Sequence, residues 1–199
     1  MIRKTVVYLL ILGTFNLLFS APKTNLEIIY GLLQKSVEEI TNRFPGNIGK
    51  VSVDFIAPDQ YKILGNRLIY YLNEEGYLQP EENGEKPVEL KYALEKINVN
   101  YSDSFRDGLL GKYKVKRDVS ISGTYVTGRG EKVIFTNTFN NTYSDTVNYS
   151  DVEKLQSLSV PFTKSELPPE PLFDSLLEPV VAIGTLIVTV ILLFTVRSK

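Results

Sequence analysis

The feature that most constrains this chain is an apolar stretch near its C-terminus. Residues 180–196 contain no charged side chain. As an α-helix, these 17 residues would cover about 25 Å, which with flanking residues is enough for the ~30 Å hydrocarbon core of a bilayer. Arg197 and Lys199 follow the stretch, and a basic end belongs in the cytoplasm. We therefore predict a single transmembrane helix over residues 179–196 and a cytoplasmic tail over 197–199.

The N-terminus has the layout of an export signal. Arg3 and Lys4 precede an apolar run over residues 6–19, and the small residues Ser20 and Ala21 follow it. This order is typical of a signal peptide, which we assign to residues 1–20, with an uncleaved anchor as the alternative. Together with the basic tail, it predicts a single-pass protein of the inner (cytoplasmic) membrane whose domain faces the periplasm.

Composition excludes several functions. The 199 residues include no Cys and no His, so disulfides, thiolate chemistry and a lipoprotein anchor are excluded, and the commonest general base is missing. Residues 21–178 carry 18 basic and 23 acidic side chains, a net charge of −5, and this gives no footprint for nucleic acid. We predict that the chain is not an enzyme, with no catalytic, cofactor-binding or metal-ligating residues and no cofactor.

The segment from Thr24 to Phe44 has the period of an amphipathic helix. Thr24 and Glu27 form a capping-box pattern, and Pro45 and Gly46 end the helix. The residues expected on its inner face are Leu26, Ile29, Tyr30, Leu33, Val37, Ile40 and Phe44.

A second helix is predicted from Asp59 to Glu75. Asp59 is the expected N-cap, and Gly76 is the expected C-terminal stop. Its expected inner face consists of Ile63, Leu64, Leu68, Tyr71 and Leu72. Before it, alternation over residues 51–57 predicts a short strand, and after it residues 80–87 form a polar loop.

From Val88 the apolar period changes to two, which predicts three long antiparallel strands. The first has a bulge near Lys96, where the apolar positions change phase. The second carries Tyr113, Val115, Val119, Ile121 and Tyr125 on one face. A turn at Thr127–Gly130 leads into the third, which carries Val133, Phe135, Phe139 and Tyr143.

These elements predict an α+β fold in which two helices pack on a mainly antiparallel sheet, with the transmembrane helix appended. The domain is assigned to residues 21–158. Prolines at positions 161, 168, 169 and 171 predict a spacer over residues 159–178.

Three patterns are candidate sites. Gly123, Gly128 and Gly130 fit a hairpin turn better than a phosphate loop. Glu81, Glu82 and Glu85 fit a solvated turn better than a calcium loop. The basic stretch of Lys112, Lys114, Lys116 and Arg117 is interpreted as solubilising charge on a strand, with contact to lipid headgroups as the alternative.

A family resemblance enters at residues 59–125. The helix ending in YYLNEEGYLQ, with Gly76 and Tyr77 after it, and the hairpin RDVSISGTYVTGRGEKVIFTNTF resemble small α+β domains of bacterial envelope-assembly proteins. These are the curli-secretion lipoprotein family, the flagellar-assembly envelope proteins and the N-terminal domain of the Tol translocation protein. The resemblance implies that the helix helps an export or scaffold protein to form multimers and that the hairpin is a long exposed β element.

The sequence therefore favours a membrane-anchored envelope protein that acts as a scaffold or assembly factor through protein–protein contacts. The expected contact surface is the outer strand over residues 133–143 or the exposed side of the first helix. The expected partners are membrane lipid and either another envelope protein or further copies of the chain, and not nucleic acid. The alternative is an extracytoplasmic ligand-binding or sensory domain.

Overall fold

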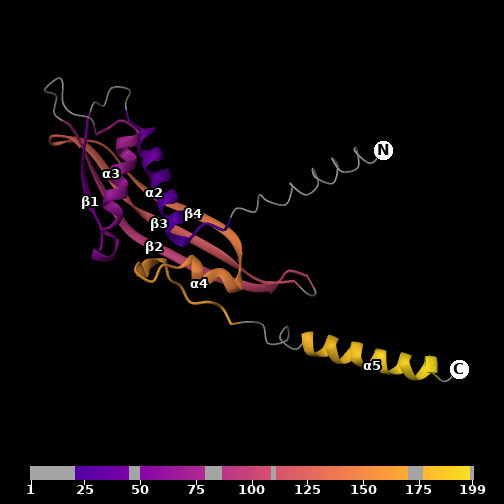
Figure 1. Ribbon diagram of the computed structural model, residues 1–199. Helices are drawn as coiled ribbons and strands as arrows, with labels where there is room; N and C mark the ends of the chain where they lie inside the picture. The colour runs from indigo at the N-terminus through magenta and orange to yellow at the C-terminus, as the bar shows by residue number, and fades with distance from the viewer. Residues whose placement is uncertain (1–20, 45–49, 79–86, 109–110, 170–176, 198–199) are drawn as a thin grey trace, which may run out of the picture.

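The computed structural model describes residues 21–44, 50–78, 87–108, 111–169 and 177–197. It shows an elongated α+β domain and a separate apolar helix, as predicted (Figure 1). The elements are α2 (Asn25–Thr41), β1 (Val51–Ile56), η1 (Asp59–Tyr61), α3 (Leu64–Glu74), β2 (Val88–Arg106), β3 (Tyr113–Arg129), β4 (Lys132–Asn148), η2 (Tyr149–Asp151), α4 (Val152–Leu155), η3 (Pro161–Thr163) and α5 (Leu177–Arg197).

The four strands form one sheet in the order β1-β2-β3-β4. The predicted meander is confirmed, because β2, β3 and β4 pair antiparallel to one another in sequence. β1 adds to the outer side of β2 in the parallel direction, with Val51 opposite Val88. This parallel pairing follows from the connection through α3, which returns the chain to the end of the sheet where β1 began.

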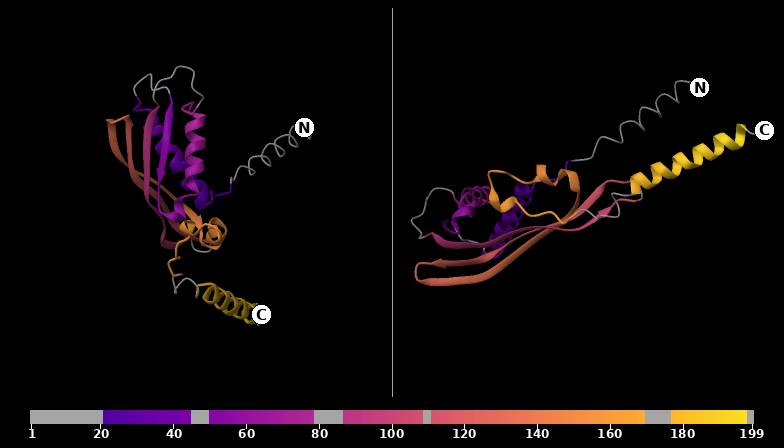
Figure 2. Two further views of the ribbon diagram at one scale, coloured as in Figure 1. Left: turned by 90° about the vertical axis from the view of Figure 1, so that its left-hand side faces the viewer. Right: turned by 90° about the horizontal axis from the view of Figure 1, so that it is seen from below.

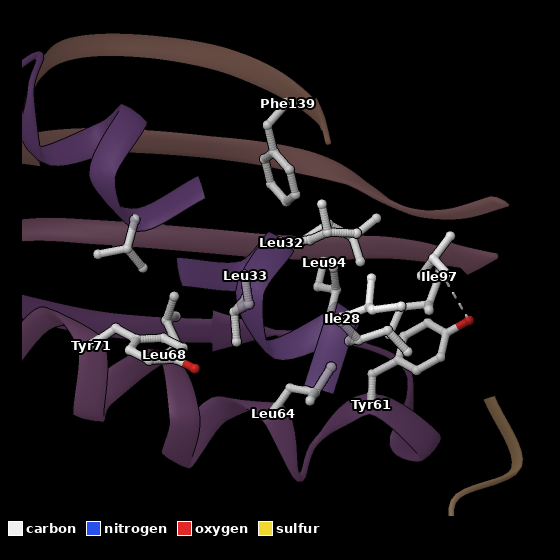
Figure 3. Packing of buried hydrophobic residues seen from close by; sticks show 14 of the residues in the cluster. Ile28, Leu32, Leu33, Tyr61, Leu64, Leu68, Tyr71, Leu94, Ile97 and Phe139 are labelled. Carbon is white, nitrogen blue, oxygen red and sulfur yellow. Dashed lines mark hydrogen bonds between the residues drawn. The ribbon is translucent and has the colours of Figure 1, made fainter. Parts of the chain in front are cut away.

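Both long helices of the domain lie on the same face of the sheet (Figure 2). α2 begins at the predicted capping box, in which the backbone N–H of Glu27 donates to the hydroxyl of Thr24 and the N–H of Thr24 donates to the Glu27 carboxylate. It ends at Thr41, three residues before the predicted end. The side chains buried between helices and sheet include Ile28, Leu32, Leu33, Leu64, Leu68, Leu94 and Phe139 (Figure 3).

The start of α3 differs from the prediction. Asp59 makes no capping hydrogen bond; its carboxylate instead pairs with the ammonium of Lys62 at 2.6 Å. Residues 59–61 form a 3-10 turn, and this changes the rotation of the side chains that come after it. As a result Ile63, predicted on the inner face, is 56% exposed. Gly76 ends the helix region with a φ of +84°, as predicted.

The strand details follow the predicted phase over most of the sheet. The bulge near Lys96 is confirmed by a register shift between Leu94 and Lys96. The turn between β3 and β4 is tighter than predicted, because Arg129 still pairs with Lys132 and Gly130 takes the positive φ of 61°.

Residues 149–169 fold back onto the domain. Thr163 is fully buried, and the hydroxyl of Tyr149 donates to the carbonyl of Pro168 at 2.9 Å. The first half of the stretch expected to be a spacer is thus packed against the domain, whereas residues 170–176 lie outside the described residues.

α5 is long and apolar enough to cross a membrane. The window Pro179–Val196 has a mean hydropathy of 2.6, and none of it is buried against the rest of the chain. The predicted signal peptide at residues 1–20 and the tail residues 198–199 lie outside the described residues.

Candidate functional site: the uncovered edge of the sheet

β4 is the last strand of the sheet, and no strand among the described residues pairs with its outer side. Its pairing with β3 runs from Lys114 opposite Asn148 to Arg129 opposite Lys132. In such an edge strand, every other residue points its N–H and C=O groups away from the sheet, where they can pair with an added strand. At roughly 3.3 Å per residue, the 17 residues of β4 give an edge about 55 Å long.

The β4 edge lacks most of the features that normally block strand addition. Proteins protect free edges with short strands, prolines and charged side chains, lysine above all. Residues 133–144 contain no charge and no proline. A bulge at Ile134 interrupts the pairing near the turn, but from Phe135 to Asn148 the register with β3 is regular.

Several apolar side chains of β4 remain accessible. Val133 is 59% exposed, Ile134 39% and Tyr143 36%, although Val133 and Tyr143 were predicted to continue the buried face. Val133 lies opposite Gly128, on the turn side of the bulge at Ile134, so its side chain is on the outer face of the sheet. Tyr143 lies on the helix face, opposite Val119, but beyond the part of β4 that α2 covers, where Phe139 and Asn141 are buried and the Asn141 amide donates to the carbonyl of Leu32 at 3.4 Å. The edge therefore offers apolar contacts near both of its ends.

The opposite side of the sheet offers only a short edge. β1 has only six residues, and beyond it the N–H of Ile97 in β2 donates to the Tyr61 hydroxyl at 3.4 Å. The ring of Phe162 packs edge-on against Tyr61, with ring centroids 5.3 Å apart. The hydroxyl of Ser104 donates to the carbonyl of Pro169 at 3.1 Å. Of the two sides of the sheet in the described part of the chain, only the β4 side offers a long free edge.

A buried polar cluster lies at the other end of β3 and β4 from their turn. The guanidinium of Arg117, fully buried, donates to both carboxylate oxygens of Asp145, from Nε at 2.8 Å and from Nη2 at 2.6 Å. Nη1 donates to the carbonyl of Lys23 at 2.8 Å and to Oδ1 of Asn25 at 2.9 Å. Burial lowers the pKa of Arg117, but the hydrogen bond and charge of Asp145 outweigh it, so that the pKa is raised.

Asn25 extends this cluster to the C-terminal part of the domain. Its amide Nδ2 donates to the Tyr101 hydroxyl at 2.9 Å and to the Thr163 carbonyl at 2.7 Å. Burial is the main cause of the raised pKa of Tyr101, which therefore stays protonated. Because each of these groups already has a partner, we assign the cluster a structural role, in which it ties the start of α2 to β2, β3, β4 and η3.

Alternate residues of β3 face opposite sides of the sheet, so the basic stretch is divided between the two faces. The interpretation of Arg117 as a solubilising charge was therefore wrong. Lys116 points outward and pairs with Asp118 at 3.5 Å, and Lys114 pairs with Asp107 at 2.6 Å. Arg117 points inward, between Val115 and Val119. Its parity with those two valines was the signal in the sequence that its charge would be buried.

The other candidate patterns are placed as follows. Gly130 lies in the turn, whereas Gly123 lies inside β3, where an added Cβ would be 2.0 Å from the Ala93 carbonyl oxygen and 2.8 Å from the Phe139 ring. Glu81, Glu82 and Glu85 lie outside the described residues. Within the described ranges, no group of three or more acidic side chains is placed to hold a metal ion. That the chain has no catalytic, cofactor-binding or metal-ligating residues stays a prediction.

Comparison with known proteins gives little. No protein-family model matches the chain, and no curated protein matches its sequence. A crystal structure of a minor lipoprotein from Acinetobacter baumannii is similar with a TM-score of 0.36 and 14% identity, over 68% of this chain and 90% of the other. The crystal structure of the rare lipoprotein B from Shewanella oneidensis is similar with a TM-score of 0.28 and 12% identity, over 69% and 98%. Similarities of this size do not place the chain in a family.

Proposed function

We propose that this chain is a membrane-anchored protein of the bacterial envelope that acts as a scaffold or assembly factor, and that it binds its partner by adding a strand to the β4 edge. The observation that carries the proposal is the long, neutral edge over residues 133–144, uncovered in the described residues. An exposed edge of this kind promotes aggregation unless another chain covers it. A bound partner strand satisfies the outward N–H and C=O groups and removes that hazard.

The proposed occupant is an extended segment of a different envelope protein. Residues 21–178 carry a net charge of −5, so two copies of the domain side by side would repel each other. A neutral or basic partner strand meets no such repulsion. The Ser, Thr and Asn side chains on the outer face of β4 are uncharged, so they do not select a partner strand by its charge. Val133, Ile134 and Tyr143 supply apolar contact.

In the proposed topology, the anchor keeps one end of this edge near the membrane. Ser104, near the β2–β3 hairpin, holds Pro169, and α5 begins at Leu177. Eight residue steps span at most about 28 Å, so the hairpin end of the domain stays close to the membrane surface. The β3–β4 turn is at the opposite end of the sheet (Figure 1). In this arrangement β4 extends from near the inner membrane into the periplasm.

Site-specific photocrosslinking in intact cells tests the proposal. A crosslinker at Thr138 or Thr142, both exposed on β4, should give discrete bands of higher mass, whose added mass is that of another envelope protein. The control position is Ser122, which lies on the same face but one strand inward, opposite Asn140. Bands of equal strength from Ser122 would contradict binding at the edge. A band of twice the monomer mass would show that the partner is a second copy of this chain and not a different protein.

Charge placed on the edge gives an independent test. The double variant Thr138→Lys, Thr142→Lys should abolish the crosslinks made from a third position, Asn140, without lowering the unfolding temperature, because both side chains face solvent. The matched variant Ser122→Lys should leave the bands intact. Loss of the bands in both variants would indicate a partner that binds the outer face of the sheet.

Orientation is tested separately. A protease added to spheroplasts should digest the domain and spare the last few residues after α5, because the basic tail belongs in the cytoplasm. Protection of the domain would reverse the proposed topology.

A further inference from the structure

A shallow cavity lies between α2 and α3. Its volume is about 320 Å³, and it is lined by Lys23, Glu27, Tyr30, Gly31, Gln34, Arg67 and Tyr71. This volume is at the lower end of the range for sites that bind small molecules. The cavity shares no lining residue with β4, so a binding site here is independent of the proposed strand addition.

Arg67 is the central cation of this cavity. Its guanidinium carbon lies 4.6 Å from the centroid of the Tyr30 ring, 5.3 Å from that of Tyr70 and 5.6 Å from that of Tyr71. These cation–π contacts hold the guanidinium in place but leave its charge uncompensated. No carboxylate in the described part of the chain lies within ion-pair distance of Arg67.

Gly31 leaves open space in the cavity wall. It lies in the interior of α2, and a Cβ added there would have no neighbouring atom within 4 Å. Neither close packing nor a positive φ requires glycine at this position. A glycine inside a helix costs about 0.5–1 kcal/mol relative to alanine. The glycine therefore lowers the stability of α2 without a packing reason. A ligand that approaches the backbone of α2 would occupy the open space beside Gly31.

The charges of the lining residues select the ligand. Lys23 and Arg67 are cationic, and Glu27 is anionic because its hydrogen bonds with Thr24, chiefly the one from the backbone N–H, lower its pKa. The net charge of about one positive unit suits a singly charged anion better than a doubly charged phosphate. The pKa of the Tyr71 phenol is raised mainly by burial, so this hydroxyl stays protonated and remains a donor.

We propose that this cavity binds a carboxylate group, with the carboxylate on the guanidinium of Arg67 and the attached organic part against Tyr30 and the open backbone at Gly31. The planar fork of arginine matches the two oxygens of a carboxylate. The carboxylate belongs either to a small organic acid or to the C-terminus of a peptide, because both would pair with the guanidinium in the same way.

The test uses the full chain in detergent micelles and follows binding by calorimetry. Phenylacetate should bind saturably, and phenylacetamide, which has the same shape without the charge, should bind at least about tenfold more weakly, as should inorganic phosphate. The tripeptide Gly-Gly-Phe is compared with its C-terminal amide in the same way. Tighter binding of the tripeptide than of phenylacetate assigns the site to a peptide end, and the reverse order assigns it to a small acid.

Variants locate the binding. Arg67→Gln should weaken phenylacetate binding at least about tenfold, and Arg67→Lys should weaken it as well because lysine lacks the planar fork. Gly31→Ala should weaken binding while leaving the fold intact. The control is Lys35→Gln, which removes an exposed cation of α2 outside the cavity and should change nothing.

Three results would overturn the proposal. They are the absence of saturable binding of both acids up to about 10 mM, equal affinity in Arg67→Gln and the unsubstituted protein, and phosphate binding more tightly than either acid. None of these results bears on the β4 edge, which is tested by crosslinking.

Discussion

Arg117 and Asp145 lie directly opposite each other in β3 and β4, and their side chains form a two-point ion pair on the buried face of the sheet. Arg117 is fully buried, whereas the side chain of Asp145 is 22% exposed. The pair sits where the start of α2 and the segment around Thr163 come together, because Asn25 contacts both Arg117 and Thr163. Through Asn25, the ion pair belongs to a hydrogen-bond network that joins segments 138 residues apart.

Removing either partner of this pair should destabilise the domain strongly. Arg117→Met removes the cation that pairs with the Asp145 carboxylate and the donor to the Lys23 carbonyl, and breaking a buried pair costs about 3–5 kcal/mol. The measurement is urea unfolding of the full chain in detergent, followed by circular dichroism. The matched variant Lys116→Met changes the adjacent, outward-pointing cation and should alter the free energy of unfolding by less than about 0.5 kcal/mol. Similar midpoints for the two variants would mean that the pair contributes no stability.

The capping box of α2 should make stability depend on pH in the acid range. Hydrogen bonds with Thr24 lower the pKa of Glu27 below its ordinary value of 4.5, so the carboxylate stabilises the folded state above that value and this contribution is lost as the pH falls through the lower, folded pKa. At pH 7 Glu27→Gln should therefore be less stable than the unsubstituted protein, by less than about 1 kcal/mol because the side chain is exposed. The difference in unfolding midpoint should shrink toward about pH 3. A difference that grows on acidification would contradict the assigned sign.

Two glycines should respond in opposite directions to alanine. In β3, the added Cβ of Gly123→Ala meets the backbone of Ala93 and the ring of Phe139, so the strand must shift, at a cost of about 1–3 kcal/mol. In α2, Gly31→Ala adds a Cβ in open space and should stabilise the helix by about 0.5–1 kcal/mol. Thermal unfolding of both variants in parallel should show a lower unfolding temperature for Gly123→Ala and a higher one for Gly31→Ala. Equal destabilisation would indicate that the space beside Gly31 is filled.

Truncation should separate the anchor from the packed C-terminal segment. A chain that ends at Glu178 lacks the apolar window Pro179–Val196 of α5 and should be soluble and folded, whereas the full-length protein should stay in the membrane fraction after an alkaline wash. A chain that ends at Leu158 also loses Phe162 and Thr163, and with them the contact with Tyr61 and the hydrogen bond from Asn25. It should be soluble but should unfold at clearly lower urea concentration. Full-length protein in the wash would refute the anchor.

Local features could be predicted from the sequence because they depend on neighbouring residues. The capping box of Thr24 and Glu27 is set by a spacing of three residues, and the stop at Gly76 by the freedom of glycine to adopt a positive φ. The bulge at Lys96 followed from a change in apolar phase. One failure was also local in origin: a 3-10 turn before α3 rotated Ile63 toward solvent, although the apolar period alone placed it inside.

The candidate sites depended on contacts between distant parts of the chain. Alternation of apolar residues indicates which face of a strand is apolar, but it does not indicate which strand lies at the edge of the sheet. The outer side of β4 is free because β1 pairs in parallel with β2, at the opposite edge of the sheet. The three tyrosines around Arg67 come from two helices whose relative position only packing decides.

The sequence by itself determined the period of each element, where most of them begin and end, and the presence over residues 180–196 of an apolar helix long enough to cross a membrane, because these properties arise within a stretch of consecutive residues. The tertiary structure alone decided that Asp145 is the partner of Arg117, that residues 161–169 pack on the domain instead of spacing it from the membrane, and that β4 has a free edge. Each of these depends on which surfaces meet when the sheet and helices bury their apolar faces together, and that choice is made by the whole chain.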